Sequence, residues 1–283
     1  MMNIIKKVIL VLIACFAIVL YKAVFMLPHW NLPEVEIGEG DGSVQVYYIS
    51  LDKAEDRRKI LMPRLENLGL TYERIYAIYG KDLLQEEKNK KANRLIFKIT
   101  QRREVEDGEI GCYLSHLKAW QTFLKSKASY ALILEDDATF NPDELRNMVN
   151  LLLQNKDKWD YVNLDPHRDG NGRVIQKLSD KHKLIAPRQV VWATVGYLIK
   201  RKAAATLIKH ALPMVAPVDI YINRSWELGY KYRIVYPNIL GHDFGDTYIG
   251  DRTKVTVNKY IRCLAKLNSL IRDFMCKMMA KFG

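Results

Sequence analysis

The sequence predicts an α/β fold with a mostly parallel central sheet. Segments typical of strands alternate with segments typical of helices from residue 44 onward, which is the pattern of a parallel sheet covered by helices. Residues 130–134, YALIL, show no polar alternation, so we expect a strand buried on both faces. Residues 108–126 repeat apolar side chains at the helical period, which indicates a helix with an apolar stripe.

The other elements follow from the same periods and from residues that break them. We predict strands at residues 43–51, 72–78, 130–134, 161–164 and 195–200. We predict helices at residues 53–70, 108–126, 141–154, 201–211 and 219–228. The first helix should end near Gly69, although Pro63 is unfavourable inside a helix. Residues 81–107 are highly charged and are expected to form a loop or short helices.

An apolar segment begins the chain, and we interpret it as a membrane anchor or a cleavable signal. Residues 8–27 are interrupted only by Lys22, and a lysine near a helix end can extend to the membrane surface. Residues 12–15, LIAC, also have the form of a lipoprotein processing site. The predicted organisation is an N-terminal membrane segment at 1–29, a linker at 30–43, a main domain at 44–250 and a basic helix at 251–283.

The chain is strongly basic, with a formal net charge of +12. This charge favours an acidic partner, such as anionic lipid, a phosphorylated substrate or nucleic acid, without choosing among them. The cysteines form no C-x-x-C pair, so neither a zinc ribbon nor a disulfide framework is indicated.

Three consecutive carboxylates, Glu135, Asp136 and Asp137, follow the buried strand at 130–134. Ligands bind beyond the carboxyl ends of the strands in α/β sheets, so the triplet should face a ligand crevice. Adjacent carboxylates repel each other and raise the pKa of at least one, unless a cation neutralises them. Mg²⁺ or Mn²⁺ suits such oxygen ligands. The alternative is that Asp136 or Asp137 only caps the next helix.

Three segments in this order resemble the glycosyltransferase family 25 domain of bacterial lipooligosaccharide glycosyltransferases and collagen galactosyltransferases. They are VYYISLDKAEDRR at 46–58, GEIGCYLSHLKAW at 108–120 and YALILEDDATF at 130–140. A weaker similarity extends the match over about 44–240. The resemblance implies a GT-A-like nucleotide-sugar-binding fold and transfer with inversion, commonly from UDP-galactose. The implied acceptor is a glycan or glycolipid, such as lipooligosaccharide or LPS, and no nucleic-acid partner is expected.

The resemblance also implies that the carboxylate triplet is a metal signature. Mn²⁺ or Mg²⁺ would stabilise the leaving nucleoside diphosphate as a Lewis acid. Asp137 is then the preferred direct ligand and Glu135 a further metal candidate, while Glu135 or Asp136 reaches the ribose or a metal-bound water. His242 is a candidate to complete the metal site, although this part of the sequence departs from the family pattern.

Inversion requires a base that removes the proton of the acceptor hydroxyl, and a well-placed carboxylate can do this. Asp219, at the expected start of a helix facing the crevice, is the preferred candidate, and Asp165 is the second. Each has the alternative role of a helix cap or turn residue.

The first and second motifs supply the candidates for donor binding. Asp52 is expected to contact the base or ribose, and Arg57 or Arg58 to pair with phosphate. The resemblance places Ser115 and His116 near the donor sugar. The alternatives are a solvated basic helix face for the arginines and a structural role for the histidine.

Residues 254–283 carry seven Lys or Arg against one Asp, beside an apolar stripe at helical spacing. This pattern predicts a basic amphipathic helix on an anionic membrane surface; the alternative is packing against the domain or a partner helix. Lys6 and Lys7 predict a cytoplasmic N-terminus with the domain on the far side. A bacterial enzyme that uses cytoplasmic nucleotide-sugars needs the near side, so the side of the membrane stays open.

Two other classes of protein fit parts of this pattern. A metal-dependent nucleotidyltransferase or phosphohydrolase would also place clustered carboxylates beyond a strand. A noncatalytic membrane-bound glycan-binding module would explain the basic helix. Sugar transfer accounts best for the three motifs together.

Overall fold

The computed structural model describes residues 37–166, 170–243 and 259–282. The predicted membrane segment at 1–29 and the first half of the predicted linker lie outside the described residues. No helix within the described part of the chain is long and apolar enough to cross a bilayer. The predicted anchor therefore stays a prediction.

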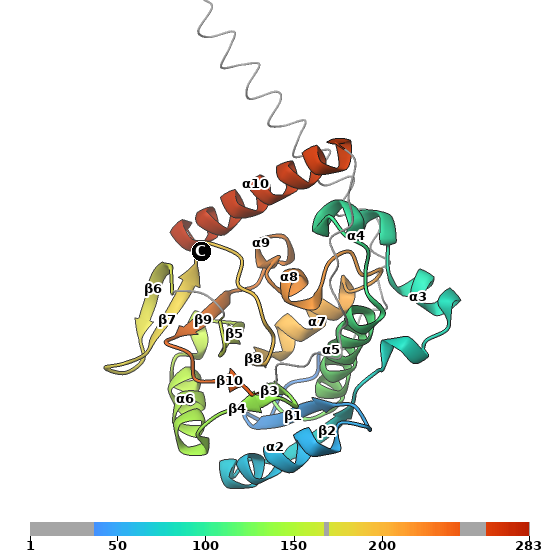
Figure 1. Ribbon diagram of the computed structural model, residues 1–283. Helices are drawn as coiled ribbons and strands as arrows, with labels where there is room; N and C mark the ends of the chain where they lie inside the picture. Colours follow the sequence, from blue (N-terminus) through green and yellow to red (C-terminus); the bar gives the residue numbers. More distant parts are fainter. Residues whose placement is uncertain (1–36, 167–169, 244–258, 283) are drawn as a thin grey trace, which may run out of the picture.

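An eight-stranded sheet forms the centre of the molecule, in the order β2-β1-β3-β8-β5-β9-β7-β6 (Figure 1). Its strands are β1 (Val44–Ser50), β2 (Tyr72–Tyr76), β3 (Tyr130–Glu135), β5 (Tyr161–Asn163), β6 (Gly172–Lys177), β7 (Lys183–Pro187), β8 (Gly196–Lys200) and β9 (Tyr232–Tyr236). Pairing makes β7 and β8 antiparallel to their neighbours, while the other strands share one direction. The predicted α/β fold with a mostly parallel sheet is confirmed in this form.

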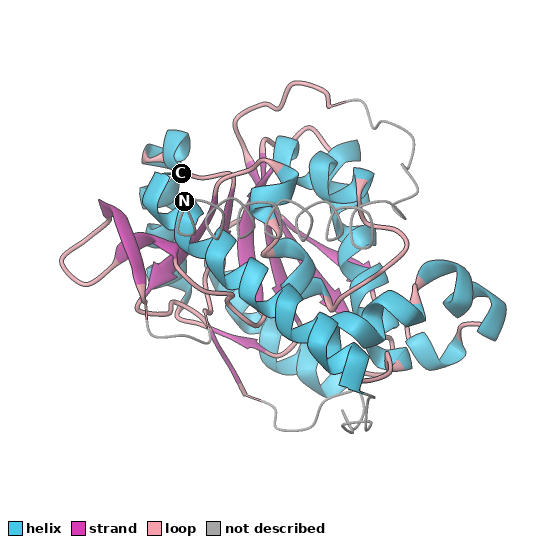
Figure 2. Cartoon of the chain, turned by 90° about the horizontal axis from the view of Figure 1, so that it is seen from above, coloured by secondary structure: helices cyan, strands magenta, loops and turns pink. Residues whose placement is uncertain are grey.

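Helices cover both faces of the sheet, and Figure 2 shows the strands side by side between them. The cores on the two faces are separate clusters of buried side chains. One face carries α2 (Glu55–Leu68) and α6 (Pro142–Gln154), and the other carries α5 (Asp107–Lys125), α7 (Arg201–Lys209) and α8 (Val218–Ile222). The remaining α-helices are α3 (Gln85–Lys91), α4 (Arg94–Gln101), α9 (Ser225–Leu228) and α10 (Lys259–Phe282), and the short 3₁₀ helices are η1 (Gly80–Asp82) and η2 (Lys156–Lys158).

Local sequence signals explain where the helices begin and end. Helix α2 continues through Pro63 and ends at Gly69, whose left-handed φ of 68° is easy for glycine. Helix α6 begins after Asn141, whose side chain accepts hydrogen bonds from the first backbone N–H groups of the helix. Arg201 caps the C-terminus of α5. Its buried guanidinium donates hydrogen bonds to backbone carbonyls at the end of that helix, among them those of Leu124 and Ser126.

The single helix predicted at 219–228 is wrong, because two short helices, α8 and α9, occupy this region. The side chain of Asn223 lies at the end of α8 and bonds to both backbone groups of Val191. This pair of hydrogen bonds fixes α8 to the loop between β7 and β8.

Candidate active site

The carboxylate cluster, defined here as Glu135, Asp136 and Asp137, lies at the carboxyl end of β3. Glu135 ends the strand, and the two aspartates form the turn into the short strand β4 (Ala138–Thr139). The pairing of Ile49 with Glu135 brings the end of β1 beside this turn. The cluster thus occupies the edge of the sheet where α/β proteins bind ligands.

Arg57 forms ion pairs with two members of the carboxylate cluster. One guanidinium nitrogen of Arg57 lies 3.1 Å from Asp136 and 3.4 Å from Asp137. The side chains of all three residues are mostly buried, so this ion pair is weakly screened by solvent. The arginine that the sequence assigned to phosphate therefore contacts the carboxylates in this structure.

Asp137 keeps one carboxylate oxygen without a partner. Its Oδ1 atom is buried and has no hydrogen-bond partner within the described ranges. Burial, followed by repulsion from Glu135 and the smaller opposing effect of Arg57, raises the pKa of Asp137 to about 7. An unpartnered buried carboxylate oxygen is suited to a bound cation. The cation would coordinate the free oxygen and would offset the repulsion between Asp137 and Glu135.

Glu135 is held by a chain of hydrogen bonds from the core. Its Oε1 accepts from the Thr194 hydroxyl at 2.7 Å and lies 3.3 Å from His116 Nε2. Burial raises the pKa of Glu135, but the His116 and Thr194 hydrogen bonds and nearby Arg57 outweigh burial, so the pKa is lowered. Glu135 is therefore a carboxylate with a fixed orientation.

The partners of His116 select its tautomer. Its Nδ1 lies 2.9 Å from the Tyr197 hydroxyl, and that hydroxyl accepts the Trp120 indole N–H at 2.9 Å. The Tyr197 hydroxyl therefore donates its hydrogen bond to His116 Nδ1. The neutral imidazole then carries its hydrogen on Nε2, which donates to Glu135. The buried chain from Trp120 to Glu135 thus positions the cluster from the core side.

The second sequence motif has a structural role besides this chain. A Cβ on Gly111 would lie 2.4 Å from the carbonyl oxygen of Ile78, so only glycine allows the segment after β2 to approach α5 this closely. Ser115 is buried, and its hydroxyl accepts from the Ile78 N–H at 2.8 Å. Ser115, expected near the donor sugar, thus contacts this segment.

His242 and Asp165 meet beside the cluster, although they lie far apart in the sequence. Strand β10 (Gly241–His242) pairs with β4, which places His242 opposite Ala138. His242 Nδ1 lies 3.7 Å from Asp165, and the other Asp165 oxygen accepts from Asn238 at 2.8 Å. Asp165 is almost completely buried, whereas His242 is about half exposed at 44%.

The remaining candidates for donor binding lie on the turn after β1. Asp52 is largely exposed and accepts a hydrogen bond from Arg74 at 2.8 Å. Arg58 donates to the Ser50 hydroxyl and to the backbone carbonyls of Leu51 and Asp52. Arg58 therefore braces its own turn in this structure, which is a different role from the phosphate contact that the sequence suggested.

Asp219, the preferred base in the sequence analysis, begins α8 and accepts a hydrogen bond from the Ile220 N–H at 2.8 Å. Its carboxylate is partly exposed. Asn223, at the end of the same helix, forms hydrogen bonds with the backbone of Val191. Val191 lies three residues before Thr194 in the β7–β8 loop. These bonds fix α8, which carries Asp219, to the β7–β8 loop.

Among the described residues, one group of side chains near the strand ends brings its candidate ligand atoms close together. The ligand atoms of Cys112, His116 and Glu135 lie within 4.8 Å of one another. The predicted group of Asp137, Glu135 and His242 does not gather in this way among the described residues. Both groups include Glu135, at the end of β3.

Sequence reasoning missed Thr194 and Tyr197, which hold Glu135 and His116. Both lie in the TVGYLI segment at 194–199, where the sequence indicates a strand at 195–200 and a weak family resemblance, but no site residue. A threonine and a tyrosine in such a strand are ordinary residues until the pairing of β8 with β3 is known.

Comparison with known proteins identifies the family. The family model described as glycosyltransferase family 25 (LPS biosynthesis protein) matches residues 43–222. The chain belongs to glycosyltransferase family 25. The resemblance that the three motifs predicted is confirmed.

Curated relatives of this family 25 chain come from animals and bacteria. A glycosyltransferase 25 family member of Drosophila pseudoobscura pseudoobscura is 27% identical, covering 66% of this chain and 32% of the relative. Procollagen galactosyltransferase 1-A of Xenopus laevis is 27% identical, covering 63% of this chain and 30% of the relative. A Haemophilus influenzae protein provisionally assigned as a glycosyltransferase is 29% identical over 70% of each chain. The chain spans about a third of the length of the animal relatives.

Proposed function

We propose that this protein transfers galactose from UDP-galactose, with inversion, to a glycan or glycolipid acceptor such as LPS, using a GT-A-like domain. The carboxylate cluster carries the proposal, because it combines a fixed carboxylate, Glu135, with an unpartnered buried oxygen on Asp137. A relative named procollagen galactosyltransferase supports galactose as the sugar.

The residues at the end of β3 fit a divalent cation, Mn²⁺ or Mg²⁺. Asp137 would hold it through the unpartnered oxygen, together with Glu135 and His242. When bound, the cation supplies Lewis-acid stabilisation of the leaving diphosphate. Arg57 adjoins the same aspartates, so a diphosphate bound there would lie beside a guanidinium that is already paired with carboxylates.

Asp219 is the proposed base for the acceptor hydroxyl. Its carboxylate is partly exposed, whereas Asp165 is buried and already accepts a hydrogen bond from Asn238. A base must reach the proton that it removes, which favours the accessible carboxylate. We assign Asp165 instead to the orientation of His242, from which it lies 3.7 Å away.

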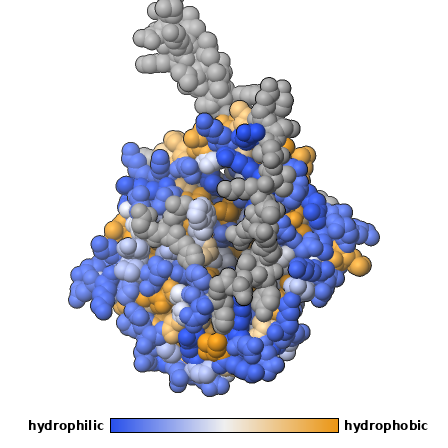
Figure 3. Space-filling model, in the orientation of Figure 1, coloured by the Kyte–Doolittle hydropathy of each residue, from blue (hydrophilic) through white to orange (hydrophobic). Residues whose placement is uncertain are grey.

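A membrane surface is the proposed location, through the predicted anchor at 1–29 and through α10. Helix α10 exposes four large apolar side chains, Leu264, Leu270, Phe274 and Met278. Figure 3 shows apolar atoms beside strongly polar ones along the upper edge of the molecule, where α10 runs. Exposed apolar side chains next to lysines are typical of helices that lie on anionic lipid. The opposite flank packs on α4 and β7, so packing and membrane contact are compatible.

The test is binding of nucleoside diphosphate sugars to the full-length protein in detergent, with and without Mn²⁺, by calorimetry. We expect Mn²⁺-dependent binding of UDP-galactose that Asp137→Asn abolishes. Asp180→Asn is the matched control, because the Asp180 side chain is 99% exposed and belongs to a different region. Absence of nucleotide-sugar binding would refute the proposal. Cleavage within the diphosphate, without an acceptor, would instead favour a phosphohydrolase.

A further inference from the structure

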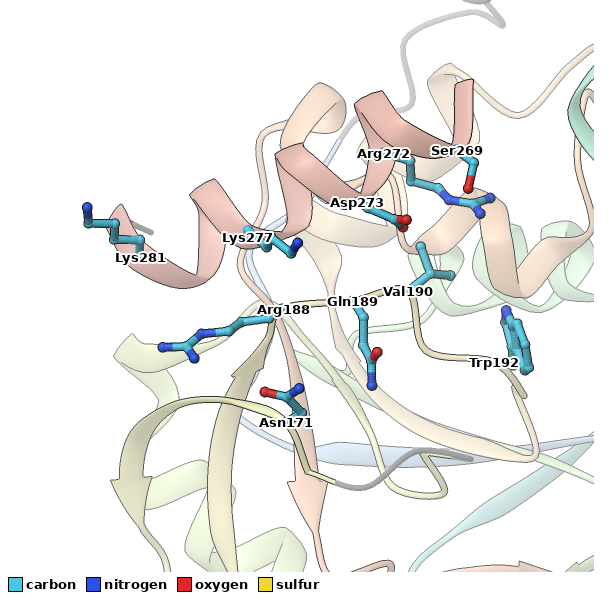
Figure 4. A pocket seen from close by; sticks show the side chains of 10 residues that line it. All are labelled: Asn171, Arg188, Gln189, Val190, Trp192, Ser269, Arg272, Asp273, Lys277 and Lys281. Carbon is cyan, nitrogen blue, oxygen red and sulfur yellow. The ribbon is translucent and has the colours of Figure 1, made fainter. Parts of the chain in front are cut away.

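A large hollow lies between α10 and the loop that joins β7 to β8. Its volume is about 890 Å³, which is in the range of small-molecule sites. We call it the basic hollow; its lining residues are Asn171, Arg188, Gln189, Val190, Trp192, Ser269, Arg272, Asp273, Lys277 and Lys281. Figure 4 shows the residues of α10 on one side and those of the loop on the other.

The charges that line the basic hollow are unbalanced. Arg188, Arg272, Lys277 and Lys281 are cationic, against the single carboxylate of Asp273. Arg188, Arg272 and Lys277 form no ion pair with a carboxylate of the described residues. The Nε atom of Arg272 is also buried without a hydrogen-bond partner in the described ranges. Cations gathered from two elements around one cavity favour an anionic ligand, and guanidinium groups favour phosphate or carboxylate.

An aromatic side chain adjoins these cations. Trp192 lines the same cavity and is 49% exposed, although large apolar side chains in this domain are mostly buried. An exposed indole gives an apolar face on which a sugar ring can pack. Cations together with an exposed indole fit an acidic saccharide better than they fit an inorganic anion alone.

The loop that carries Trp192 leads directly to the carboxylate cluster. Thr194, two residues further on, donates to Glu135 at 2.7 Å. Between them Ala193 has a φ of 76°, a conformation that is unfavourable for alanine, and its carbonyl accepts from Asn163 at 2.9 Å. The hydrogen bond from buried Asn163 thus holds the strained Ala193 in one backbone conformation, which fixes the position of Trp192 relative to Thr194.

Chain length limits the separation of the two sites. Two residues of extended chain span at most about 7 Å between Cα atoms. The aromatic edge of the basic hollow therefore lies within the reach of a short saccharide from the carboxylate cluster.

We propose that the basic hollow binds an acidic group, a phosphate or carboxylate, on the saccharide acceptor. This inference rests on the proposed function, because it assigns the acceptor side of the same site. Arg272 holds the anionic group at the end of the hollow where Trp192 lies, and Trp192 packs against a neighbouring sugar ring, while Arg188 lines the opposite end (Figure 4). The acceptor is thereby specified as an acidic glycan, and its neutral counterpart is a poor substrate.

The experiment is calorimetric titration of the full-length protein in detergent with glucose 6-phosphate, glucose and inorganic phosphate. We expect glucose 6-phosphate to bind more tightly than either of the others. Arg272→Gln should weaken that binding about tenfold, and Arg188→Gln, at the other end of the hollow, should weaken it less. Trp192→Ala should weaken glucose 6-phosphate binding without changing phosphate binding. Lys266→Gln, an exposed charge removed from the same helix outside the hollow, should change nothing.

Three results would overturn or redirect the inference. Equal binding of glucose 6-phosphate by wild type and by both arginine variants refutes it. In another outcome, the arginine variants lose binding only to phosphatidylglycerol vesicles while they still bind glucose 6-phosphate as wild type does. That result identifies a site for a lipid headgroup and also refutes the inference. UDP-galactose binding, measured on the same samples, should be unaffected by the arginine substitutions. If wild type binds glucose 6-phosphate but no nucleotide-sugar, the acidic saccharide site stands and the proposed function fails.

Discussion

The carboxylate cluster and the basic hollow differ in how their charges are balanced. In the cluster, Arg57 lies within 3.4 Å of two aspartates, and His116 and Thr194 hold Glu135. In the hollow, three of the four cations form no ion pair with a described carboxylate. The cluster is thus preorganised by the chain itself, whereas the hollow is suited to a charge brought by a ligand.

The largest expected effect comes from removing the charge of Asp137. We expect Asp137→Asn to reduce transfer at least about 100-fold, since Asp137 is the main ligand in the proposed cation site that would stabilise the leaving group. Its folded-state pKa of about 7 exceeds the ordinary value of 3.8, so its contribution to stability falls as pH rises from about 4 to about 7. Without added metal, the variant should therefore be more stable than wild type at pH 8, by about 1–3 kcal/mol.

Thermal unfolding at pH 5 and pH 8 measures this difference. Asp180→Asn should change neither activity nor the pH dependence of stability. A loss of stability at pH 8 in Asp137→Asn would contradict the pKa assigned to this carboxylate and would weaken its interpretation as a cation site.

The next effect tests the backbone support of the cluster. A Cβ at Gly111 would lie 2.4 Å from the Ile78 carbonyl, so Gly111→Ala should reduce the free energy of unfolding by about 2–3 kcal/mol. Gly38→Ala is the control, because the nearest atom to its new Cβ lies at 3.9 Å. Urea unfolding compares the two variants. Equal stability would mean that α5 and the segment after β2 can separate freely.

A smaller effect is expected from the hydrogen-bond chain behind Glu135. Tyr197→Phe leaves the Trp120 N–H and His116 Nδ1 without their shared partner, at a cost of about 1–3 kcal/mol in stability. Transfer should fall about tenfold, because the proton on His116 is then no longer fixed on Nε2. Steady-state kinetics and urea unfolding are the measurements. Tyr76→Phe, at an exposed position, should behave as wild type; normal activity of Tyr197→Phe would show that the chain is structural only.

The smallest effect belongs to the rim of the basic hollow. Lys277 is exposed, so Lys277→Gln should weaken glucose 6-phosphate binding by only about two- to fivefold. The difference from wild type should shrink as salt is raised from 50 to 500 mM, because exposed charges are screened. Calorimetry at the two salt concentrations tests this. A difference independent of salt would mean that Lys277 is desolvated by the ligand.

The carboxylate cluster could be predicted from the sequence, whereas the basic hollow could not. The cluster was visible in the sequence because its three carboxylates are consecutive and follow an apolar strand. The basic hollow was not visible, since its residues come from 171–192 and from 269–281 and are interspersed with ordinary polar residues. The basic composition of the last helix predicts either a helix on a membrane surface or one packed against the domain or a partner helix, and it does not predict a cavity.

Several candidate roles changed for the same reason. Arg57 and Arg58 are neighbours on one helix and were given the same expected partner. In the structure Arg57 reaches the aspartates of β3, while Arg58 bonds to its own turn. One residue of helix rotates a side chain by about 100°, so the two face different surroundings. Sequence spacing alone does not say what lies on each side.

By itself, the sequence determined the α/β class, the strand that ends in three carboxylates, the approximate positions of α2, α5, α6 and α7, and the family. These follow from periodicity and from contiguous motifs, which are local properties of the chain. Only the tertiary structure decided that Arg57 neutralises Asp136 and Asp137, that Tyr197 sets the tautomer of His116, and that α10 and the β7–β8 loop enclose a cavity. Those contacts join residues about 80 positions apart and depend on strand register and helix rotation, which no local pattern contains.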